Sequence, residues 1–303
     1  MSESLFEKIV IFDANGVAWT EFHGMPQFSF NKMLTGVAYG FILQVLALAK
    51  HYNTNRFVFC WDGRKSFRKE RHPWYKEKRA YENKTEEEQE KYVRAIGQID
   101  KIRKTMLPSL GFSQHFRTPG FEADDLIASI VINNPGDFVV VTTDNDLLQL
   151  LNNCDIYNPR KKAEITKKSF WRENHLTPQD WVRVKAIGGC TSDGVPGVPG
   201  VAETTAIQYL RKELSPTSKK FQKIESFEGQ TIIERNKWLV ELPLEDTPPL
   251  YLNFGSDSFD YDKFLDTCAE FGFRSLLKPE IKSLWRSLFC GEEERPMMGG
   301  MNV

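Results

Sequence analysis

The sequence predicts an α/β fold with a mostly parallel central sheet and flanking helices, on the basis of three buried strands and two helices. Each predicted strand is a continuous apolar run that ends on an aspartate: Ile9–Asp13, Phe57–Asp62 and Phe138–Asp144. Runs without polar alternation are typical of strands buried on both faces, as in parallel sheets. Apolar residues at helical spacing predict helices at Leu34–His51 and Glu122–Ile132. In such folds ligands bind at the carboxyl ends of the strands, where the three aspartates lie.

Two further regions follow from the pattern of the chain. The long polar stretch 67–107 favours helix and interrupts the alternation before a short element near residues 112–116. An insertion of this length at the edge of a site is typically a lid or binding element. Beyond residue 177, amphipathic segments predict helices at Pro178–Ile187, Ala202–Leu214, Phe259–Phe271 and Lys278–Phe289. We expect an α/β domain over residues 1–176, a smaller helical domain over 177–290 and a disordered tail over 291–303.

Length and composition are those of an ordinary globular protein. The 303 residues suffice for one large core, or for one core and a smaller domain. No apolar run reaches the roughly 18 residues of a membrane span, and the first residues do not resemble a secretory signal. Five cysteines are scattered without paired spacing, which argues against a disulfide framework or a zinc site and indicates a reducing cytosol.

Charge is distributed unevenly along the chain. The net charge is −1, from 40 Lys and Arg residues against 41 Asp and Glu residues, whereas many duplex-binding proteins are basic overall. The stretch 64–104 nevertheless contains 14 basic and 8 acidic residues, and the stretch 160–185 contains 8 basic and 3 acidic residues. The neutral total is therefore compatible with basic surfaces that bind nucleic acid.

Eight acids stand out because they follow predicted strands, open predicted helices or lie in a Gly- and Pro-rich loop. They are Asp13, Asp62, Glu122, Asp124, Asp125, Asp144, Asp146 and Asp193. Any one of them alone is equally well explained as a helix N-cap or as an anion near a helix dipole. Together in one crevice they would repel each other unless cations compensated their charge. Carboxylate oxygens suit Mg²⁺ or Mn²⁺, and two such ions can clamp the attacking and leaving oxygens of a phosphodiester.

The three acids around Glu122 can serve one site only at a helix start. On a continuous helix Glu122 and Asp125 share a face, whereas Asp124 points away from Glu122. Where the chain is still turning into the helix, this restriction does not apply. We expect Asp125 to support the metal ligands rather than to bind an ion itself.

These acids lie in motifs that resemble the flap endonuclease and 5′-nuclease family, in particular bacteriophage 5′→3′ exonucleases and the 5′-nuclease domain of bacterial DNA polymerase I. The motifs are Asp13, the pair Asp62-Gly63 followed by a basic run, Gly120–Asp125, Thr143–Gln149 and Ser192–Gly200. They occur in the family's order over residues 8–210. The resemblance implies a PIN-like nuclease fold with two metal ions. The first ion would be held by Asp13, Asp62, Glu122 and Asp124, and the second by Asp144, Asp146 and Asp193.

The segment His72–Arg79 resembles the helical arch of this family, within the insertion 67–107. By this resemblance Tyr75, Lys76 and Arg79 bind the substrate at the scissile phosphate. On a helix, Lys76 and Arg79 would also face one way, which suits the charge of a phosphoryl transition state. Tyr75 offers a ring on which an unpaired base can stack. The alternative interpretation of these charges is a solvated surface helix.

The stretch Gly194–Ala206 resembles the helix–turn–helix element with which the family binds the duplex backbone around a K⁺ ion. Gly197 and Gly200 would let main-chain amides approach phosphate at a helix N-terminus. The sequence departs from the family at two positions. Ala202 stands where a third glycine is usual, and Cys190 stands where the pattern Gly-Asp-x-x-Asp has its first acid. We expect Cys190 to be a buried small side chain rather than a Mg²⁺ ligand, because soft sulfur disfavours hard cations.

The expected function is a structure-selective 5′-nuclease, a 5′→3′ exonuclease or flap endonuclease that uses two Mg²⁺ ions or Mn²⁺ in their place. Its substrates would be DNA with 5′ flaps or ends and RNA–DNA hybrids, as in primer removal during phage DNA replication. A metal-bound hydroxide would attack, so no protein nucleophile is required. Two alternatives stay open. One is a PIN-type ribonuclease, against which the arch and the helix–turn–helix segment count, and the other is a branched-DNA-binding protein whose second metal site is impaired by Cys190.

We further expect a monomer that does not associate with membranes and that resides in the cytoplasm, which for a phage protein is that of the host cell. The tail 291–303 is where replication proteins, such as a single-stranded DNA-binding protein, would dock.

Overall fold

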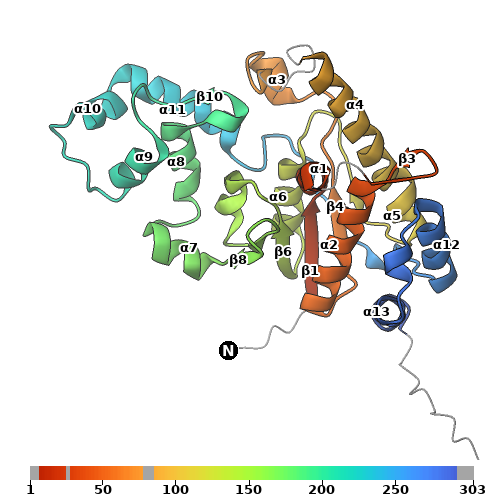
Figure 1. The fold of residues 1–303 in the computed structure, drawn as a ribbon. Coiled ribbons are helices and arrows are strands. Elements are labelled where there is room, and N and C mark those ends of the chain that lie inside the picture. The colour runs from red at the N-terminus through yellow and green to blue at the C-terminus, as the bar shows by residue number, and fades with distance from the viewer. Residues whose placement is uncertain (1–6, 25–27, 78–84, 292–303) are drawn as a thin grey trace, which may run out of the picture.

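The computed structural model describes residues 7–24, 28–77 and 85–291. At its centre lies a six-stranded sheet (Figure 1). The strands are β1 (Lys8–Asp13), β4 (Phe57–Cys60), β5 (His115–Phe116), β6 (Asp137–Val141), β7 (Cys154–Asn158) and β8 (Ala163–Ile165). They lie in the order β5-β4-β1-β6-β7-β8, and all neighbours pair in parallel except β7 and β8. The predicted α/β fold with a mostly parallel central sheet is confirmed.

Both faces of the sheet are buried, which explains the unbroken apolar runs of the sequence. In β1, Val10 and Phe12 belong to one hydrophobic cluster, whereas Ile11 between them belongs to a second. β4 repeats this arrangement, with Phe59 in the first cluster and Val58 in the second. Successive side chains of a strand point to opposite faces, so each face requires its own cover of helices.

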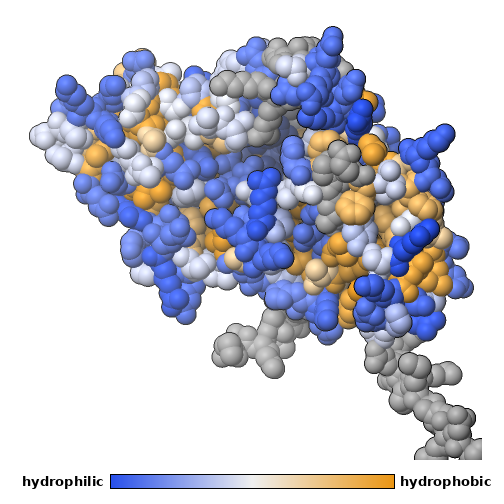
Figure 2. All heavy atoms as spheres, in the orientation of Figure 1, coloured by the Kyte–Doolittle hydropathy of each residue, from blue (hydrophilic) through white to orange (hydrophobic). Residues whose placement is uncertain are grey.

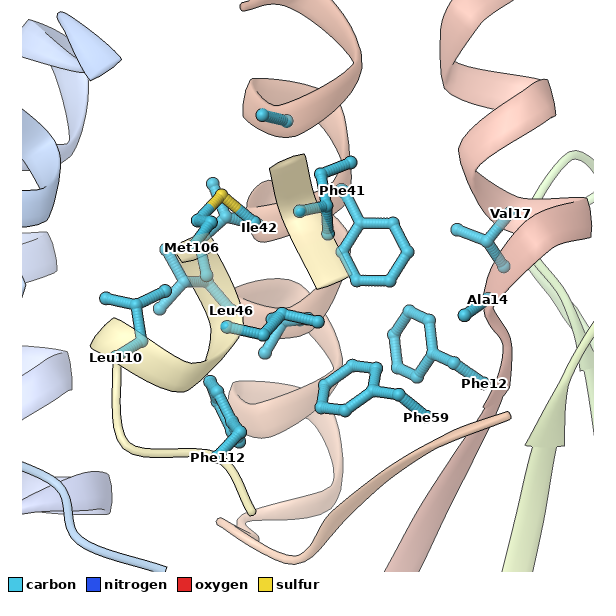
Figure 3. Close-up of a cluster of buried hydrophobic side chains, with 14 of the residues drawn as sticks. Phe12, Ala14, Val17, Phe41, Ile42, Leu46, Phe59, Met106, Leu110 and Phe112 are labelled. Carbon is cyan, nitrogen blue, oxygen red and sulfur yellow. The ribbon is translucent and has the colours of Figure 1, made fainter. Parts of the chain in front are cut away.

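Helices from both ends of the chain cover the first face. They are α1 (Ala14–Gly24), α2 (Gly36–Tyr52), α4 (Glu86–Lys101), α5 (Leu107–Ser109), α12 (Tyr261–Phe271) and α13 (Pro279–Phe289), with short helical turns at Ile102–Met106 and Arg274–Leu277. Figure 3 shows Phe12 and Phe59 of the sheet beside Phe41 of α2, and the rings of Phe12 and Phe41 lie 5.4 Å apart. This packing fixes β1, and with it Asp13 at the end of the strand.

Helices α6 (Ala123–Asn133) and α8 (Asp180–Gly188) contribute to the second cluster. Beside the sheet, α8 to α11 form a lobe (Figure 1). The lobe contains β9 (Gly189–Cys190), β10 (Val195–Pro196), α9 (Glu203–Leu210), α10 (Lys219–Glu225) and α11 (Phe227–Val240). The other elements are β2 (Ser29–Phe30), β3 (Met33–Leu34), α3 (Phe67–Arg71), α7 (Lys167–Asn174) and turns of 3₁₀ helix at Asn145–Leu150, Thr191–Asp193 and Phe254–Ser256.

The insertion 67–107 is only partly a surface element. It holds α3 and α4, and its residues 78–84 lie outside the described ranges. Thr85 caps α4, because its hydroxyl accepts a hydrogen bond from the amide of Glu88 while the Glu88 carboxylate accepts one from the amide of Thr85. From Ala95 onward, however, apolar residues of α4 and of the next turn pack into the first cluster. This part of the insertion therefore belongs to the core.

The last two helices also return to the core of the sheet. Phe264 of α12 and Trp285 of α13 are fully buried in the first cluster, with their rings stacked 4.4 Å apart. The sequence assigned both helices to a separate domain over residues 177–290. That division stays a prediction, but α12 and α13 share the hydrophobic core of the α/β part rather than one confined to α8–α11.

An extended return segment, residues 241–258, leads from α11 back along α6. Asp125 Oδ1 accepts a hydrogen bond from the amide of Leu244 at 2.9 Å, and Ser129 Oγ accepts one from the amide of Leu250 at 3.1 Å. Polar side chains one turn apart on α6 thus satisfy backbone donors that would otherwise be buried without a partner.

The surface seen in Figure 2 is mostly hydrophilic, with apolar side chains gathered on the side where α1, α2 and α12 lie. Among the described residues, none of the helices has the length and apolar character needed to cross a bilayer. The tail predicted over residues 291–303 falls outside the described part of the chain beyond Gly291.

Candidate active site

The carboxyl ends of β1, β4 and β6 open into one groove of about 1510 Å³. Six of the eight acids singled out in the sequence line it: Asp13, Asp62, Glu122, Asp124, Asp144 and Asp146. Because the three strands are parallel neighbours, the acids that end or follow them reach the same edge of the sheet. The groove therefore gathers the carboxylates as the sequence pattern indicated.

Backbone and side-chain donors hold the first two carboxylates in place. Asp13 Oδ1 accepts a hydrogen bond from the amide of Gly16, and its Oδ2 accepts one from the Thr142 hydroxyl, both at 3.0 Å. A Cβ at position 16 would lie 2.3 Å from Asp13 Oδ2, so any larger residue there would displace this carboxylate. Asp62 Oδ1 accepts a hydrogen bond from the amide of Ala123 at 3.0 Å, which links the end of β4 to the first residue of α6.

The start of α6 separates the three acids of the Glu122 cluster. Glu122 precedes the helix in extended conformation, and Asp124 lies in the first turn, so both side chains line the groove. Asp125 is fully buried on another side, with its oxygens 2.6 and 2.8 Å from two guanidinium nitrogens of Arg68. Its Oδ2 also accepts a hydrogen bond from the amide of Glu122 at 3.0 Å. Asp125 thus fixes the entry into α6.

Lys76 reaches the groove from a turn rather than from a helix. Helix α3 ends at Arg71, and Lys76 has a φ of 51°, in the left-handed region. The expected helical spacing of Lys76 and Arg79 is therefore wrong at Lys76, and Arg79 itself lies outside the described residues. Lys76 Nζ lies 2.7 Å from Glu122 Oε2 and 3.8 Å from Asp193 Oδ2.

Tyr75 is a buried residue in this structure. Its side chain is 3% exposed and belongs to a third hydrophobic cluster together with Val182 and Cys190. The expectation that the ring offers a face to an unpaired base is wrong here, because protein atoms cover that ring. Its hydroxyl instead lies 3.1 Å from Glu122 Oε2 and 3.4 Å from Asp193 Oδ2, within hydrogen-bond distance of both acceptors for its one proton.

The second group of acids meets at the junction of sheet and lobe. One ligand atom each of Asp146, Cys190 and Asp193 lies within 4.8 Å of the other two, and all three side chains are buried. Cys190 is 6% exposed, as expected of a buried small side chain, yet it also lines the groove. Lys185 Nζ lies 3.1 Å from Asp146 Oδ1 and 3.1 Å from Glu203 Oε2. Asp144 Oδ1 accepts a hydrogen bond from the amide of Asp146 at 2.8 Å.

Burial and crowding of these carboxylates change their pKa values. Burial, followed by the charge of Asp62, raises the pKa of Asp13 to about 7. Burial and the nearby charges of Asp13 and Asp144 raise the pKa of Asp124 well above its ordinary value. The pKa of Asp144 is raised by burial and by Asp146. Glu122 differs, because burial is outweighed by the charges of Lys76 and Arg68, which lower its pKa.

The donor set of the groove fits divalent cations. Clustered carboxylates with raised pKa values are stabilised as anions when a cation enters between them. Oxygen ligands of this kind suit Mg²⁺ and Mn²⁺. Burial and the charges of Asp146 and Asp193 raise the pKa of the Cys190 thiol to about 11.

The stretch that resembles a helix–turn–helix connects α8 to α9. Gly197 sits against α8, where an added Cβ would lie 2.4 Å from the carbonyl carbon of Gly188. Gly200 has a φ of 78°, as needed for the turn into α9. Ala202, the departure from the family pattern, has a φ of −101°, which any residue adopts, so no glycine is required there. The amine of Lys223 donates a hydrogen bond to the Pro199 carbonyl at 3.2 Å, which places a cation at this turn.

Several residues of the site were not singled out in the sequence. Arg68 and Lys185 are the partners of Asp125 and Asp146, and Thr142 holds Asp13. The only sequence signal for Lys185 is its place in the basic stretch 160–185. Arg68 likewise lies in the basic stretch 64–104, but nothing in the sequence indicates its pairing with Asp125, since only the fold brings α3 against α6.

Known proteins resemble this chain in sequence. The sequence model of the family described as 5′-3′ exonuclease, N-terminal resolvase-like domain, matches residues 8–175. The DNA polymerase I of Mycobacterium bovis is 32% identical over 214 residues, which cover 67% of this chain and 22% of the polymerase. The 5′-3′ exonuclease of Halalkalibacterium halodurans is 26% identical over 261 residues, which cover 79% of this chain and 82% of that protein. The chain thus spans about a fifth of the length of the polymerase.

Solved structures share its fold. The T5 5′-exonuclease with bound zinc superimposes with a TM-score of 0.66 at 21% identity, over 91% of this chain and 99% of that chain. The bacteriophage T5 flap endonuclease, in a complex with DNA and metal ions, gives a TM-score of 0.64 at 21% identity over the same shares of the two chains.

Proposed function

Because the chain belongs to the 5′-3′ exonuclease family, we propose that it is a structure-selective 5′-nuclease, acting as a 5′→3′ exonuclease and flap endonuclease on DNA. The observation that carries the proposal is the groove in which six carboxylates from the ends of three parallel strands and from the start of α6 face one another. A phosphodiester with its own negative charge can enter such a groove only in company with cations.

We assign two ion sites to the groove. Asp13, Asp62, Glu122 and Asp124 would hold the first ion, and Asp144, Asp146 and Asp193 the second. When bound, Mg²⁺ or Mn²⁺ supplies an activated water and stabilises the charge on the phosphate oxygens. The protein itself positions these carboxylates, through Thr142 and the amide of Gly16 for Asp13, and through the Arg68–Asp125 pair for the start of α6.

Lysines beside the acids are placed to bind the substrate phosphates. Lys76 and Lys185 both line the groove, and each is now paired with a carboxylate of the site. As a scissile phosphate arrives, it can replace that carboxylate as the partner of the lysine. Arg79 is assigned to the same phosphate by the family resemblance.

The turn between α8 and α9 would bind the duplex away from the scissile bond. Gly197 and Gly200 shape a turn that leads into the N-terminus of α9, and Lys223 lies beside it. Main-chain amides at a helix start suit backbone phosphate, and the family resemblance assigns a K⁺ ion to this turn.

The proposed setting is primer removal in phage DNA replication, where RNA–DNA hybrids are further substrates. The protein would act as a monomer in the cytoplasm of the host cell. A replication protein such as a single-stranded DNA-binding protein would dock on the tail 291–303.

A cleavage map tests the proposal directly. A 5′-labelled flap substrate and the same flap with a blocked 5′ end are incubated with the protein over a Mg²⁺ titration. We expect cleavage near the flap junction that depends on Mg²⁺ and persists, in its endonucleolytic part, on the blocked substrate. Binding of the flap without cleavage in either Mg²⁺ or Mn²⁺ would instead indicate a branched-DNA-binding protein. Cleavage of single-stranded RNA in preference to the flap would indicate a PIN-type ribonuclease.

A further inference from the structure

The second group of ligands contains a sulfur atom among its oxygens. Ligand atoms of Asp146, Cys190 and Asp193 all lie within 4.8 Å of one another. Bonds to divalent ions are about 2.0–2.3 Å long, so small side-chain movements suffice for all three atoms to contact one ion. Cys190 and Asp146 both line the groove, which gives an ion a path from solvent.

We propose that the sulfur of Cys190 is a ligand of the second ion and makes this site selective for thiophilic divalent cations such as Co²⁺, Zn²⁺ and Cd²⁺ over Mg²⁺. The inference rests on the proposed function only in that the same acids hold a cation. It goes beyond that function by naming the chemical class of ion that the second site favours.

The local backbone holds the thiol beside the acids. Cys190 of β9 pairs with Val195 of β10, and a turn of 3₁₀ helix between the two strands brings Asp193 back toward Cys190. Gly194 closes that turn with a φ of 71°. Tyr75 and Val195 share the third hydrophobic cluster with Cys190, so packing restricts the movement of the thiol.

Neighbouring charges allow the sulfur to bind a cation. Lys185 Nζ lies 3.1 Å from Asp146 Oδ1, and Lys76 Nζ lies 3.8 Å from Asp193 Oδ2. A divalent ion would replace these lysines as the partner of the two acids. When the sulfur–cation bond forms, the thiol S–H bond breaks and one proton leaves to solvent, without any transfer of electrons between protein and ion. The ion then has three anionic ligands.

The chemistry of the ligands decides which ion gains from this arrangement. Soft thiolate bonds well to cations such as Zn²⁺ and Co²⁺. Mg²⁺ demands octahedral oxygen ligands and keeps several of its waters, so it gains little from Cys190 and depends on the carboxylates of the site alone. The Ser192 hydroxyl, 3.0 Å from the sulfur, hydrogen-bonds with the thiol. The thiol is therefore the feature that distinguishes this site from one made of oxygen alone.

Cobalt provides a readout that does not depend on catalysis. The full-length, DNA-free protein is titrated with Co²⁺, and the sulfur-to-cobalt charge-transfer absorption is recorded in the near ultraviolet. Calorimetry gives the affinities for Cd²⁺ and Mg²⁺ in parallel. The test variants are Cys190→Ser, which replaces sulfur by oxygen, and Cys190→Ala, which keeps an apolar side chain in the third cluster. The matched control is Cys268→Ala, which removes another buried thiol, in α12.

We expect the absorption band in the unmodified protein and in Cys268→Ala, and its loss in both Cys190 variants. Cd²⁺ affinity should fall at least about tenfold in Cys190→Ser, because even residues that merely orient a ligand contribute roughly 10–100-fold to metal affinity. Mg²⁺ affinity should stay unchanged or rise. Co²⁺ binding without the band, or a band that persists in folded Cys190→Ala, would overturn the inference.

The flap assay in Mg²⁺ separates this inference from the proposed function. Flap cleavage by a protein that shows no cobalt–sulfur band contradicts the inference and leaves the nuclease function standing. A cobalt–sulfur band in a protein that cleaves no flap supports the inference and contradicts the nuclease function.

Discussion

Lys76 Nζ lies 2.7 Å from Oε2 of Glu122, so a lysine assigned to the scissile phosphate is paired with a carboxylate assigned to the first ion. Burial favours the neutral lysine, but the charges of Glu122 and of the neighbouring Asp193 outweigh it and raise the Lys76 pKa. The lysine is therefore held as a cation in the DNA-free protein. Substrate phosphate and metal ion must together replace both members of this pair.

Replacing Lys76 with alanine should lower the single-turnover cleavage rate much more than it weakens duplex binding. The reason is that a cation at the reacting phosphate acts on the transition state, where the loss of one such contact costs roughly 10²–10³-fold in rate. Quench-flow kinetics and equilibrium binding on the same flap measure the two effects. Lys91→Ala, an exposed lysine of α4 that also lines the groove, is the control and should leave the cleavage rate unchanged. Equal losses of rate and affinity in Lys76→Ala would mark it as an ordinary binding residue.

Asp124→Asn and Asp144→Asn should each abolish Mg²⁺-dependent cleavage and leave affinity for flap DNA largely intact. Each change removes an anionic ligand from the groove, while the basic surfaces and the turn before α9 remain to bind DNA. Asp262→Asn, an exposed acid in the first turn of α12, is the matched control. Turnover close to that of the unmodified protein in either groove variant would show that our assignment of the ion sites is wrong.

In the absence of metal, the protein should lose stability as pH rises toward 7, in part through Asp13. Burial and the charge of Asp62 raise the pKa of Asp13 to about 7 in the folded state, against an ordinary value of 3.8. The folded state therefore binds this proton more tightly, and the stabilisation is complete below the lower pKa and lost as pH rises through the higher one. One such group contributes a slope of at most about 1.4 kcal/mol per pH unit.

Urea unfolding in EDTA between about pH 4 and pH 8 measures this slope. Asp13→Asn should flatten it, and added Mg²⁺ should stabilise the protein most at the upper end, where Asp13 is ionised. Identical pH profiles for Asp13→Asn and the unmodified protein would contradict the assignment.

Removing one member of the Arg68–Asp125 pair should destabilise the fold by about 3–5 kcal/mol, because the other charge then stays buried without its partner. Both side chains are at most 2% exposed and are joined by two short hydrogen bonds. Chemical denaturation of Arg68→Met and Asp125→Asn gives the loss, and Lys69→Met, on the exposed side of the same helix, should stay within about 0.5 kcal/mol of the unmodified protein. If the Asp125→Asn variant were fully stable but inactive, Asp125 would instead take part in catalysis directly.

Cys190→Asp should lower the Mg²⁺ concentration needed for half-maximal cleavage. The added carboxylate would lie beside Asp146 and Asp193, where it restores an oxygen ligand and a negative charge. Cys190→Asn has the same shape without the charge and should leave the Mg²⁺ dependence unchanged. The thermal midpoint is measured alongside, because an unpaired carboxylate in the third hydrophobic cluster would destabilise the fold. An unchanged Mg²⁺ dependence in a stable Cys190→Asp protein would place Cys190 outside the ion site.

The sequence predicted those parts of the site that depend on strand ends. Asp13, Asp62 and Asp144 end or follow buried apolar runs, and parallel pairing then brings them together without further information. The positions of Tyr75 and Lys76 were not predictable in this way. Their local sequence favours an exposed helix, whereas contacts with Glu122 and with the third cluster select a turn.

Long-range pairing also escaped the sequence pattern. Arg68 and Asp125 are 57 positions apart, and nothing in the residues around either one indicates the other. The burial of Cys190 was expected from its residue type. Its short distance from Asp146 was not, because that distance depends on how β9 meets the turn after β6.

The return segment 241–258 leads the chain back from the lobe of α8–α11 to the first hydrophobic cluster. The lobe is therefore inserted in the chain between two parts of one core rather than appended to its end. Such a lobe has two covalent crossings, one before α8 and one after α11, and its residues also share the second hydrophobic cluster with the sheet, so it cannot reorient freely. Any shift of the lobe that widens the groove for DNA must also move the return segment, which is hydrogen-bonded to Asp125 and Ser129. Opening for the duplex and the orientation of α6, which carries Asp124, are thereby mechanically linked.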